Sequence, residues 1–283
     1  SGPVPWNDPA AIATAVDGAA VLVNLAGRSV NCRYGPANRE EILRSRVDTT
    51  RALSEAVARA DQPPALWINA STATIYRHAM DRPQTESTGE LGTGFSVSIA
   101  RAWEDAFFAG ELPNTRRVAL RMAIVLGDGS ALRPLAMLTR VGLGGAQHDG
   151  RWPTTRARRA AGTAHEQGSS GGDQRFSWAH LDDVVRVHHW LESTPEVDGP
   201  LNVASPRPET NRELMAHLRR ILRRPFGMPM RRWMLELGSF VIRTETELVL
   251  KSRWVVPERL EAAGFTFEHP DLDEALASIL NRA

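Results

Sequence analysis

Short apolar runs alternate with longer amphipathic segments along the first half of the chain. The runs at 20–25, 65–70 and 117–125 are rich in Val, Leu, Ile and Ala and are bounded by polar or turn-forming residues, which predicts buried strands. The segments 39–60 and 96–109 repeat apolar residues at helical spacing, which predicts a helix between successive strands. This alternation indicates a parallel sheet with helices on both faces. The predicted fold class is α/β, with a Rossmann-type doubly wound sheet.

The last part of the chain predicts a smaller and mostly helical unit. Thr210 and Glu213 have the capping-box spacing that opens a helix, and a further helix is expected at 272–280. We therefore divide the chain into a core domain at 1–206 and a C-terminal domain at 207–283.

The composition of the core domain changes at 150–173. Arg, Ala, Thr, Gly and Ser dominate there, and large apolar residues are almost absent after Trp152. This composition predicts a disordered insertion, because too little apolar surface is available to order the chain. Its arginines could contact nucleic acid, but no aromatic residues alternate with them, so a solvated loop is favoured and no nucleic-acid partner is expected. These arginines are Arg151, Arg156, Arg158 and Arg159.

The overall composition is that of an ordinary globular protein, with 42% hydrophobic and 24% charged residues. The net charge of +1 indicates no general attraction to nucleic acid. Cys32 is the only cysteine, which excludes an intrachain disulfide and fits a reducing cytoplasm. No apolar run is long enough to span a bilayer. We expect a cytoplasmic protein without a membrane partner.

The apolar run at 20–25 continues into a turn of small residues that ends at Gly27. Such a strand and turn are found where a doubly wound sheet meets a dinucleotide. Residues 1–19 contain no glycine-rich phosphate loop, although a strand and such a loop usually come first. We therefore expect the N-terminal strands of the sheet to be missing. The resulting unpaired edge favours association with another chain, such as a homodimer.

A series of short motifs resembles an atypical extended short-chain dehydrogenase/reductase. The motifs are Asn-Leu-Ala-Gly at 24–27, Ser-Arg-Val-Asp-Thr-Thr-Arg at 45–51, Asn-Ala-Ser-Thr-Ala-Thr-Ile-Tyr at 69–76, Leu-Arg at 120–121 with Ile-Val-Leu-Gly at 124–127, Ser-Trp-Ala-His-Leu-Asp-Asp at 177–183, and Leu-Asn-Val-Ala-Ser-Pro at 201–206. The tail at 243–265 resembles the C-terminal domain of unknown function (DUF1731-like) of "epimerase family" proteins.

The resemblance implies an NAD(P)-binding core whose substrate lobe is built from the C-terminal third. The cofactor would be NADP or NAD, and the resemblance favours NADP. The turn formed by Asn24, Leu25, Ala26 and Gly27 would line the cofactor, where small residues let the backbone approach a ribose closely. The alternative is that this turn only ends a parallel strand, as many such turns do.

The resemblance also implies a Ser or Thr, a Tyr and a Lys as catalytic groups. Thr72 stands at the Ser/Thr position, although a strand-terminal hydroxyl can instead satisfy backbone groups. Counting back from Glu104, the Tyr and Lys positions fall on Ser96 and Ala100, and neither can replace those groups. Tyr76 remains as a candidate proton donor, although the matching aromatic residue in the superfamily is usually structural.

Three arginines are candidates for anion contact, because a planar guanidinium binds phosphate through two hydrogen bonds. Arg46 and Arg121 are assigned to the cofactor and Arg28 to the substrate. A helix-capping or salt-bridge role is the alternative for each of them.

The segment at 177–180 lies beside the substrate cleft in the family that the chain resembles. Ser177, Trp178 and His180 are therefore candidate substrate contacts, and a structural role is the alternative for His180. Asp182 or Asp183 is expected to cap the helix that follows. No residues have the spacing of metal ligands in the sequence, so no metal is expected.

These observations favour an NAD(P)-dependent oxidoreductase or a nucleotide-sugar epimerase-like protein with an atypical active site. Its substrate would be a small molecule, with nucleotide sugars among the candidates. Two alternatives remain open at this point. One is a non-catalytic nucleotide-binding or regulatory scaffold of the same fold, and the other is a truncated, inactive fragment.

Overall fold

The computed structural model describes the chain except for residues 1, 130–131, 166–167, 169–170, 242 and 283. Its main sheet has four parallel strands in the order β1-β2-β3-β7. The strands are β1 (Val21–Asn24), β2 (Leu66–Thr72), β3 (Arg116–Met122) and β7 (Gly199–Val203). Within the described residues β1 has a neighbour on one side only, so it forms an edge of the sheet.

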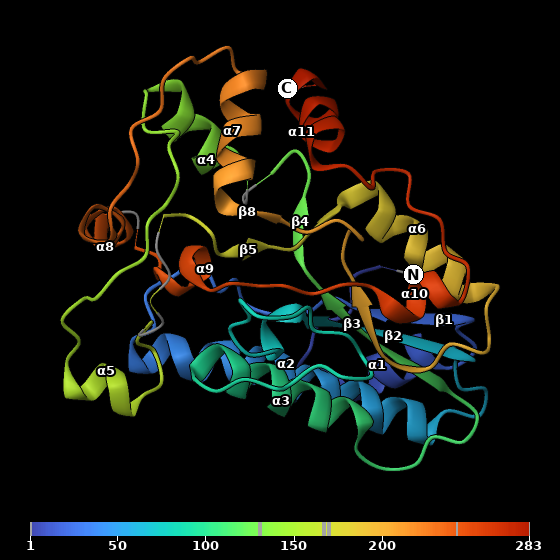
Figure 1. Cartoon of the computed structure of the whole chain (residues 1–283). Helices are drawn as coiled ribbons and strands as arrows, with labels where there is room; N and C mark the ends of the chain where they lie inside the picture. The colour runs from blue at the N-terminus through green and yellow to red at the C-terminus, as the bar shows by residue number, and fades with distance from the viewer. Residues whose placement is uncertain (1, 130–131, 166–167, 169–170, 242, 283) are drawn as a thin grey trace.

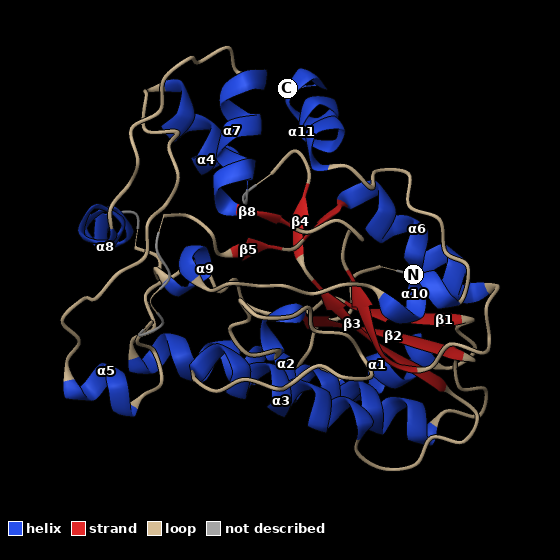
Figure 2. Ribbon diagram, in the orientation of Figure 1, coloured by secondary structure: helices blue, strands red, loops and turns tan. Residues whose placement is uncertain are grey.

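Helices cover both faces of this sheet (Figure 2). On one face lie α1 (Pro9–Val16), α2 (Pro36–Arg59) and α3 (Phe95–Phe108), with Trp67 of β2 in the apolar cluster between them. On the other face, α6 (Leu181–Glu192) and α10 (Glu258–Ala262) pack against a cluster that includes neighbouring residues of β2. Successive β2 residues thus face opposite layers, as strand geometry requires. The predicted α/β fold class is confirmed.

The third apolar run contains two strands instead of the single one expected at 117–125. After Met122 the chain leaves the main sheet, and β4 (Ile124–Leu126) pairs with β6 (Trp178–His180). The break arises because the backbone N–H of Ala123 donates to the carbonyl of Val203, and the next N–H, that of Ile124, donates to Ser177. The end of β3 therefore lies at the junction of two sheets.

A second lobe is built around β4 and β6. It contains β5 (Arg175–Phe176) paired with β8 (Glu209–Thr210), and the helices packed around these strands. The helices are α4 (Leu132–Arg140), α7 (Asn211–Ile221) and α11 (Leu272–Arg282). The capping box predicted for α7 is confirmed, because the Thr210 side chain accepts from the Glu213 backbone and the Glu213 side chain bonds back. In Figure 1 these helices lie above the main sheet.

The C-terminal segment returns from this lobe to the main sheet. After α8 (Arg232–Val241) and α9 (Glu247–Leu250), the chain crosses the molecule (Figure 1), and Arg253 bridges to Phe176 while Val255 bridges to Gln84. This crossing carries charged residues of the C-terminal domain to the ends of the core strands. No helix in the described ranges is both long and apolar enough to cross a membrane.

The segment expected to be a disordered insertion at 150–173 contains local structure over its described part. Helix α5 (Arg156–Ala160) is capped by Thr155, and the carbonyl of Gly162 accepts from the N–H of Phe95. Polar contacts replace the missing apolar anchors, because Arg158 pairs with Glu245 at 2.6 Å and the buried His165 bonds to Asp149 at 2.7 Å. Composition alone underestimated the amount of ordered structure in this segment, because the contacts that order it come from residues distant in the sequence. Residues 166–167 and 169–170 lie outside the described part.

Candidate active site

A cavity of about 400 Å³ lies at the carboxyl ends of β2 and β3. Thr72 and Thr74 line it after β2, and Met122 and Ala123 line it after β3. Ligands of open parallel sheets bind at this end of the strands. We call it the strand-end cavity. Its remaining lining comes from the loop after β1 at 29–31, from the second lobe and from the C-terminal segment.

Thr72 is the one predicted catalytic residue that lines the strand-end cavity. It ends β2 and caps a short 3₁₀ helix, η1 (Ala73–Ile75), where its Oγ1 accepts from the N–H of Thr74 at 3.1 Å. The Thr72 hydroxyl donates a hydrogen bond to no described residue. The backbone contact therefore fixes the oxygen and leaves the proton available to a ligand.

The structure places Tyr76 in the core and outside the residues that line the strand-end cavity. Its hydroxyl donates to Asn202 Oδ1 at 2.9 Å and accepts from Arg121 Nη1 at 2.9 Å. Burial raises the pKa of this hydroxyl above its usual value, against the opposing effects of Arg121 and Asn202. This geometry agrees with the structural alternative for Tyr76.

Arg121 forms a buried ion pair instead of facing a cavity. Its Nε and Nη2 donate to the two carboxylate oxygens of Glu104 at 2.9 and 2.7 Å, and Ser71 also donates to Glu104. Burial lowers the pKa of Arg121, but the hydrogen bonds and charge of Glu104 outweigh it and raise the pKa above its usual value. The guanidinium is therefore committed to Glu104, as the salt-bridge alternative predicted.

The other two candidate arginines are also engaged within the protein. Arg28 pairs with Glu41 and donates to Asn38 at 3.0 Å. Arg46 donates to the carbonyls of Arg28 and Ile42 and lies 5.0 Å from the ring centroid of Trp103. Both arginines support the loop after β1 and do not line the strand-end cavity.

Hydrogen bonds of Asn24 hold the turn at 24–27, and part of this turn is exposed. Asn24 is buried, where its Nδ2 donates to Asn69 at 2.7 Å and its Oδ1 accepts from the N–H of Ala26 at 3.0 Å. Leu25 exposes 63% of its surface. A Cβ on Gly27 would lie 3.1 Å from the Arg46 guanidinium carbon, so a larger residue here would displace the Arg46 side chain by a few tenths of an ångström.

The predicted substrate contacts at 177–180 are buried in the second lobe and do not line the strand-end cavity. Ser177 Oγ donates to the carbonyl of Arg253 at 2.8 Å and accepts from the N–H of Val255. Trp178 is in the apolar core of the lobe. His180 caps α6 through Nδ1, which accepts from the N–H of Asp182 at 3.1 Å. The expected aspartate cap is therefore wrong.

Sequence reasoning missed two cations of the C-terminal segment, Lys251 and Arg253. Lys251 Nζ donates to the carbonyl of Thr74 at 2.7 Å, and Arg253 Nε donates to Thr74 Oγ1 at 3.2 Å. Burial, followed by the charge of Arg253, lowers the pKa of Lys251 to about 8, and Glu247 opposes this shift. The signal was available, because two charges interrupt an otherwise largely apolar run at 248–256.

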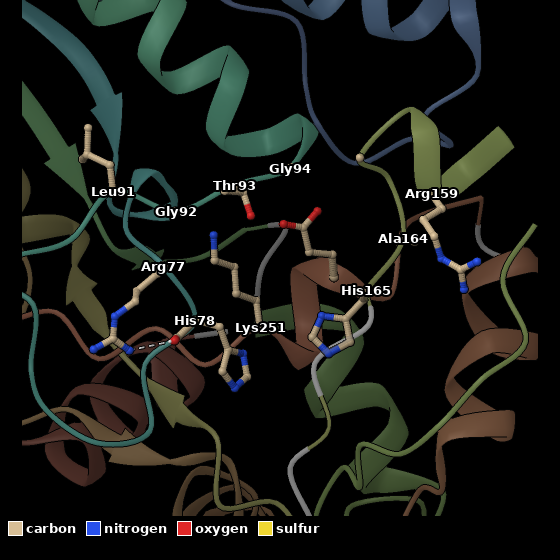
Figure 3. A pocket seen from close by; sticks show the side chains of 12 residues that line it. Arg77, His78, Leu91, Gly92, Thr93, Gly94, Arg159, Ala164, His165 and Lys251 are labelled. Carbon is tan, nitrogen blue, oxygen red and sulfur yellow. Dashed lines mark hydrogen bonds between the residues drawn. The ribbon is translucent and has the colours of Figure 1, made fainter. Parts of the chain in front are cut away.

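Lys251 also lines a second cavity, of about 660 Å³ (Figure 3). His78, His165 and Glu247 also line it. Burial and the neighbouring His165 lower the pKa of His78 to about 4, so His78 is neutral at pH 7. Glu247 accepts from Ser96 Oγ at 3.0 Å. Ser96, which stands at the tyrosine position of α3, is therefore bonded to the C-terminal domain.

One group of described residues has the spacing of metal ligands, although none was expected from the sequence. The ligand atoms of His180, Asp182 and His269 all lie within 4.8 Å of one another. The centroids of the two imidazole rings lie 3.8 Å apart, with the rings tilted by 32°, and His180 Nδ1 already accepts a backbone hydrogen bond. The chain separation of His269 explains why sequence spacing did not reveal this group.

Comparison with known proteins finds a family match in each of two parts of the chain. The NAD dependent epimerase/dehydratase family matches residues 4–204, and the domain of unknown function DUF1731 matches residues 232–279. An epimerase family protein of Mycobacterium tuberculosis is 32% identical over 290 residues, which cover 98% of this chain and 84% of the relative. Epimerase family protein YfhF of Bacillus subtilis is 26% identical over 262 residues, which cover 92% of this chain and 78% of the relative.

Two solved structures extend this likeness. The crystal structure of human epimerase family protein SDR39U1 with NADPH has a TM-score of 0.83 and 25% identity, covering 100% of this chain and 89% of that chain. The nucleoside-diphosphate sugar epimerase of Corynebacterium glutamicum has a TM-score of 0.69 and 25% identity, covering 100% of this chain and 51% of that chain. The chain therefore belongs to the NAD dependent epimerase/dehydratase family and carries a C-terminal DUF1731 domain.

Proposed function

We propose that the chain is an NADP(H)-dependent oxidoreductase or epimerase-like enzyme whose chemistry takes place in the strand-end cavity. The observation that supports this proposal is that Thr72 and Lys251 line the same cavity, at the carboxyl ends of parallel strands. A hydroxyl donor and an amine with a pKa of about 8 are the groups needed to hold an oxygen and to move its proton near neutral pH.

The residues present fit the nicotinamide half of the cofactor. Leu25 and Gly27 of the turn at 24–27 are exposed, and the loop at 29–31 that follows the turn lines the strand-end cavity. Residues 1–19 supply no glycine-rich turn for the pyrophosphate. NADP is favoured over NAD because SDR39U1, a structural relative of the chain, was solved with NADPH. When bound, the nicotinamide supplies or accepts a hydride.

The chain's own residues would handle the oxygen and the proton of the substrate. The Thr72 hydroxyl donates a hydrogen bond to the substrate oxygen, since its proton is not otherwise engaged among the described residues. In the reducing direction, the ammonium of Lys251 gives its proton to that oxygen, and the neutral amine regains a proton from water. Lys251 thus takes the role that Ser96 and Ala100 cannot fill on α3.

A binding experiment tests the proposal directly. Nicotinamide fluorescence and calorimetry would measure NADPH and NADH binding to the chain, and to a version extended by any residues encoded upstream. We expect NADPH to bind more tightly than NADH, and we expect Lys251→Met to bind NADPH as the wild type does while losing turnover. If neither cofactor binds either version, the non-catalytic scaffold is the correct interpretation. The observation that favours this scaffold is that Ser96 and Ala100 stand where the family has its catalytic Tyr and Lys.

A further inference from the structure

The strand-end cavity has an unusual distribution of charge. Three cationic side chains line it, and every other described lining residue is uncharged. Arg253 and Lys251 come from the C-terminal segment, and Arg175 comes from β5. The cavity therefore carries positive charge without any carboxylate in its described wall.

The buried cations of the cavity differ from other buried arginines of the chain. Arg121 pairs with Glu104, and Arg232 pairs with both Asp149 and Glu236. No described carboxylate lies within ion-pair distance of Arg253, although only 6% of this residue is exposed. A buried charge without a counterion costs free energy, so most proteins pair it or give it a ligand.

The contacts of these cations position them without neutralising them. Arg253 donates to the hydroxyl of Thr74 and to the carbonyls of Leu248 and Lys251, and its Nη2 donates to no described residue. Lys251 donates to the carbonyl of Thr74. Arg175 stacks its guanidinium 4.4 Å from the ring centroid of Trp254. The hydrogen-bond and stacking partners of the three groups are thus neutral, Glu247 acts on Lys251 and Arg253 only from beyond ion-pair distance, and donors are left for an anion.

Apolar side chains occupy the wall between the strand ends and the second lobe. Met122, Ile124, Leu135, Phe176 and Leu214 all line the same cavity. A volume of about 400 Å³ is at the small end of the range for ligand pockets. The cavity therefore suits a compact ligand with an apolar body and a charged head.

We propose that the strand-end cavity binds a small molecule with an anionic group, a carboxylate or a phosphate, bonded by Arg253 and Arg175 close to the positive charge of Lys251, and with an apolar body against the second lobe. This inference rests on the proposed function in one respect, because it names the substrate class of the same cavity. An apolar body separates this ligand from a sugar. Arg175 and Arg253 suit two oxygens of one anion, since a guanidinium fork matches a carboxylate or a phosphate.

Calorimetry and thermal shift without any cofactor test the inference. The probes are benzoate, phenyl phosphate and benzamide, which share a ring and differ in the charge of the head group. We expect benzoate or phenyl phosphate to bind and to raise the Tm, and we expect benzamide to do neither. Which of the two anions binds more tightly distinguishes a carboxylate from a phosphate ligand. Equal binding of benzamide, or no binding of either anion at millimolar concentration, would overturn the inference.

Variants locate the binding. Arg175→Gln should weaken anion binding by about tenfold, the size expected for a lost charge-assisted hydrogen bond, and Lys251→Met should weaken it less, because it removes only a nearby positive charge. Arg140→Gln is the matched control, because it removes an exposed cation from α4 and should leave the affinity unchanged. Unchanged anion affinity in both cavity variants would refute the assignment even if one of them folds poorly. Anion binding without NADPH binding would refute only the proposed function, and the reverse would refute only this inference.

Discussion

Lys251 donates a hydrogen bond of 2.7 Å to the carbonyl oxygen of Thr74, which joins the C-terminal domain to the end of a core strand. The two residues are separated by most of the chain, yet both line the strand-end cavity. Because the lysine is buried beside Arg253, its ammonium is destabilised and its proton is easily given up. This contact is the basis of the first two predictions.

Replacing Lys251 by Met should abolish proton transfer while keeping the fold. We expect kcat to fall by about a hundredfold or more, in the range found for lost general acid–base catalysis, with NADPH affinity unchanged. The free energy of unfolding should not fall, because the variant removes a buried cation without a paired carboxylate. Stopped-flow NADPH oxidation and urea unfolding measure these quantities. A kcat close to that of the wild type would exclude Lys251 as the proton donor.

The pH dependence of carbonyl reduction should follow Lys251. The pKa of Lys251 is lowered from 10.5 to about 8, so activity should decline as pH rises through about 8 and the ammonium is lost. Arg253 and Glu247 act on this pKa in opposite directions, and Arg77, His78, Arg159 and His165 also line the second cavity that Lys251 borders. A pH–kcat profile that stays flat through pH 8 would contradict the assignment.

The same shift predicts how stability changes with pH. Between about 8 and 10.5 the unfolded chain binds a proton at Lys251 that the folded chain does not. The contribution of Lys251 to the free energy of unfolding therefore rises with pH across this window. Urea unfolding at pH 8 and pH 10 should show this rise in the wild type relative to Lys251→Met, which lacks the titrating group.

Thr72 should act through its hydroxyl. We expect Thr72→Val, which keeps the shape of the side chain, to lower kcat by about tenfold or more, because one hydrogen bond to the reacting oxygen is lost. Thr72→Ser keeps a hydroxyl and should retain most of the activity. Steady-state kinetics of the wild type and the two variants measure these changes in kcat. Equal losses in both variants would indicate a packing role for Thr72.

Tyr76 should contribute to stability and not to proton transfer. In Tyr76→Phe, Arg121 and Asn202 each lose a buried hydrogen-bond partner, which should cost about 1–3 kcal/mol. The kcat should stay within about twofold of the wild type, because Tyr76 does not line the strand-end cavity. Chemical denaturation and turnover, measured on the same preparation, separate the two roles.

The ion pair between Arg121 and Glu104 should be a major stabilising contact once it is formed. Glu104→Gln leaves Arg121 buried and charged, which should cost about 3–5 kcal/mol. The control is Arg44→Gln, which breaks an exposed ion pair with Asp48 and should cost under about 1 kcal/mol. Urea unfolding of both variants gives the comparison, and similar small losses would mean that Arg121 is solvated or paired elsewhere.

The sequence by itself determined the alternation of strands and helices, because a strand of period two and a helix of period 3.6 leave different apolar patterns. It also located the turn at 24–27, the hydroxyl of Thr72 and the capping box of α7, since each is a local feature. The family resemblance followed from the order of these local motifs, and it is confirmed by the family matches.

Only the tertiary structure decided which charged residues face the cavity. Arg28, Arg46 and Arg121 looked like anion-binding groups, but each is engaged by a residue that sequence spacing does not place beside it. Lys251 and Arg253 looked like part of a tail, yet they reach the strand ends because the C-terminal segment crosses the molecule. The physical reason is that the availability of a charge depends on its neighbours in space, and these neighbours are fixed by long-range packing.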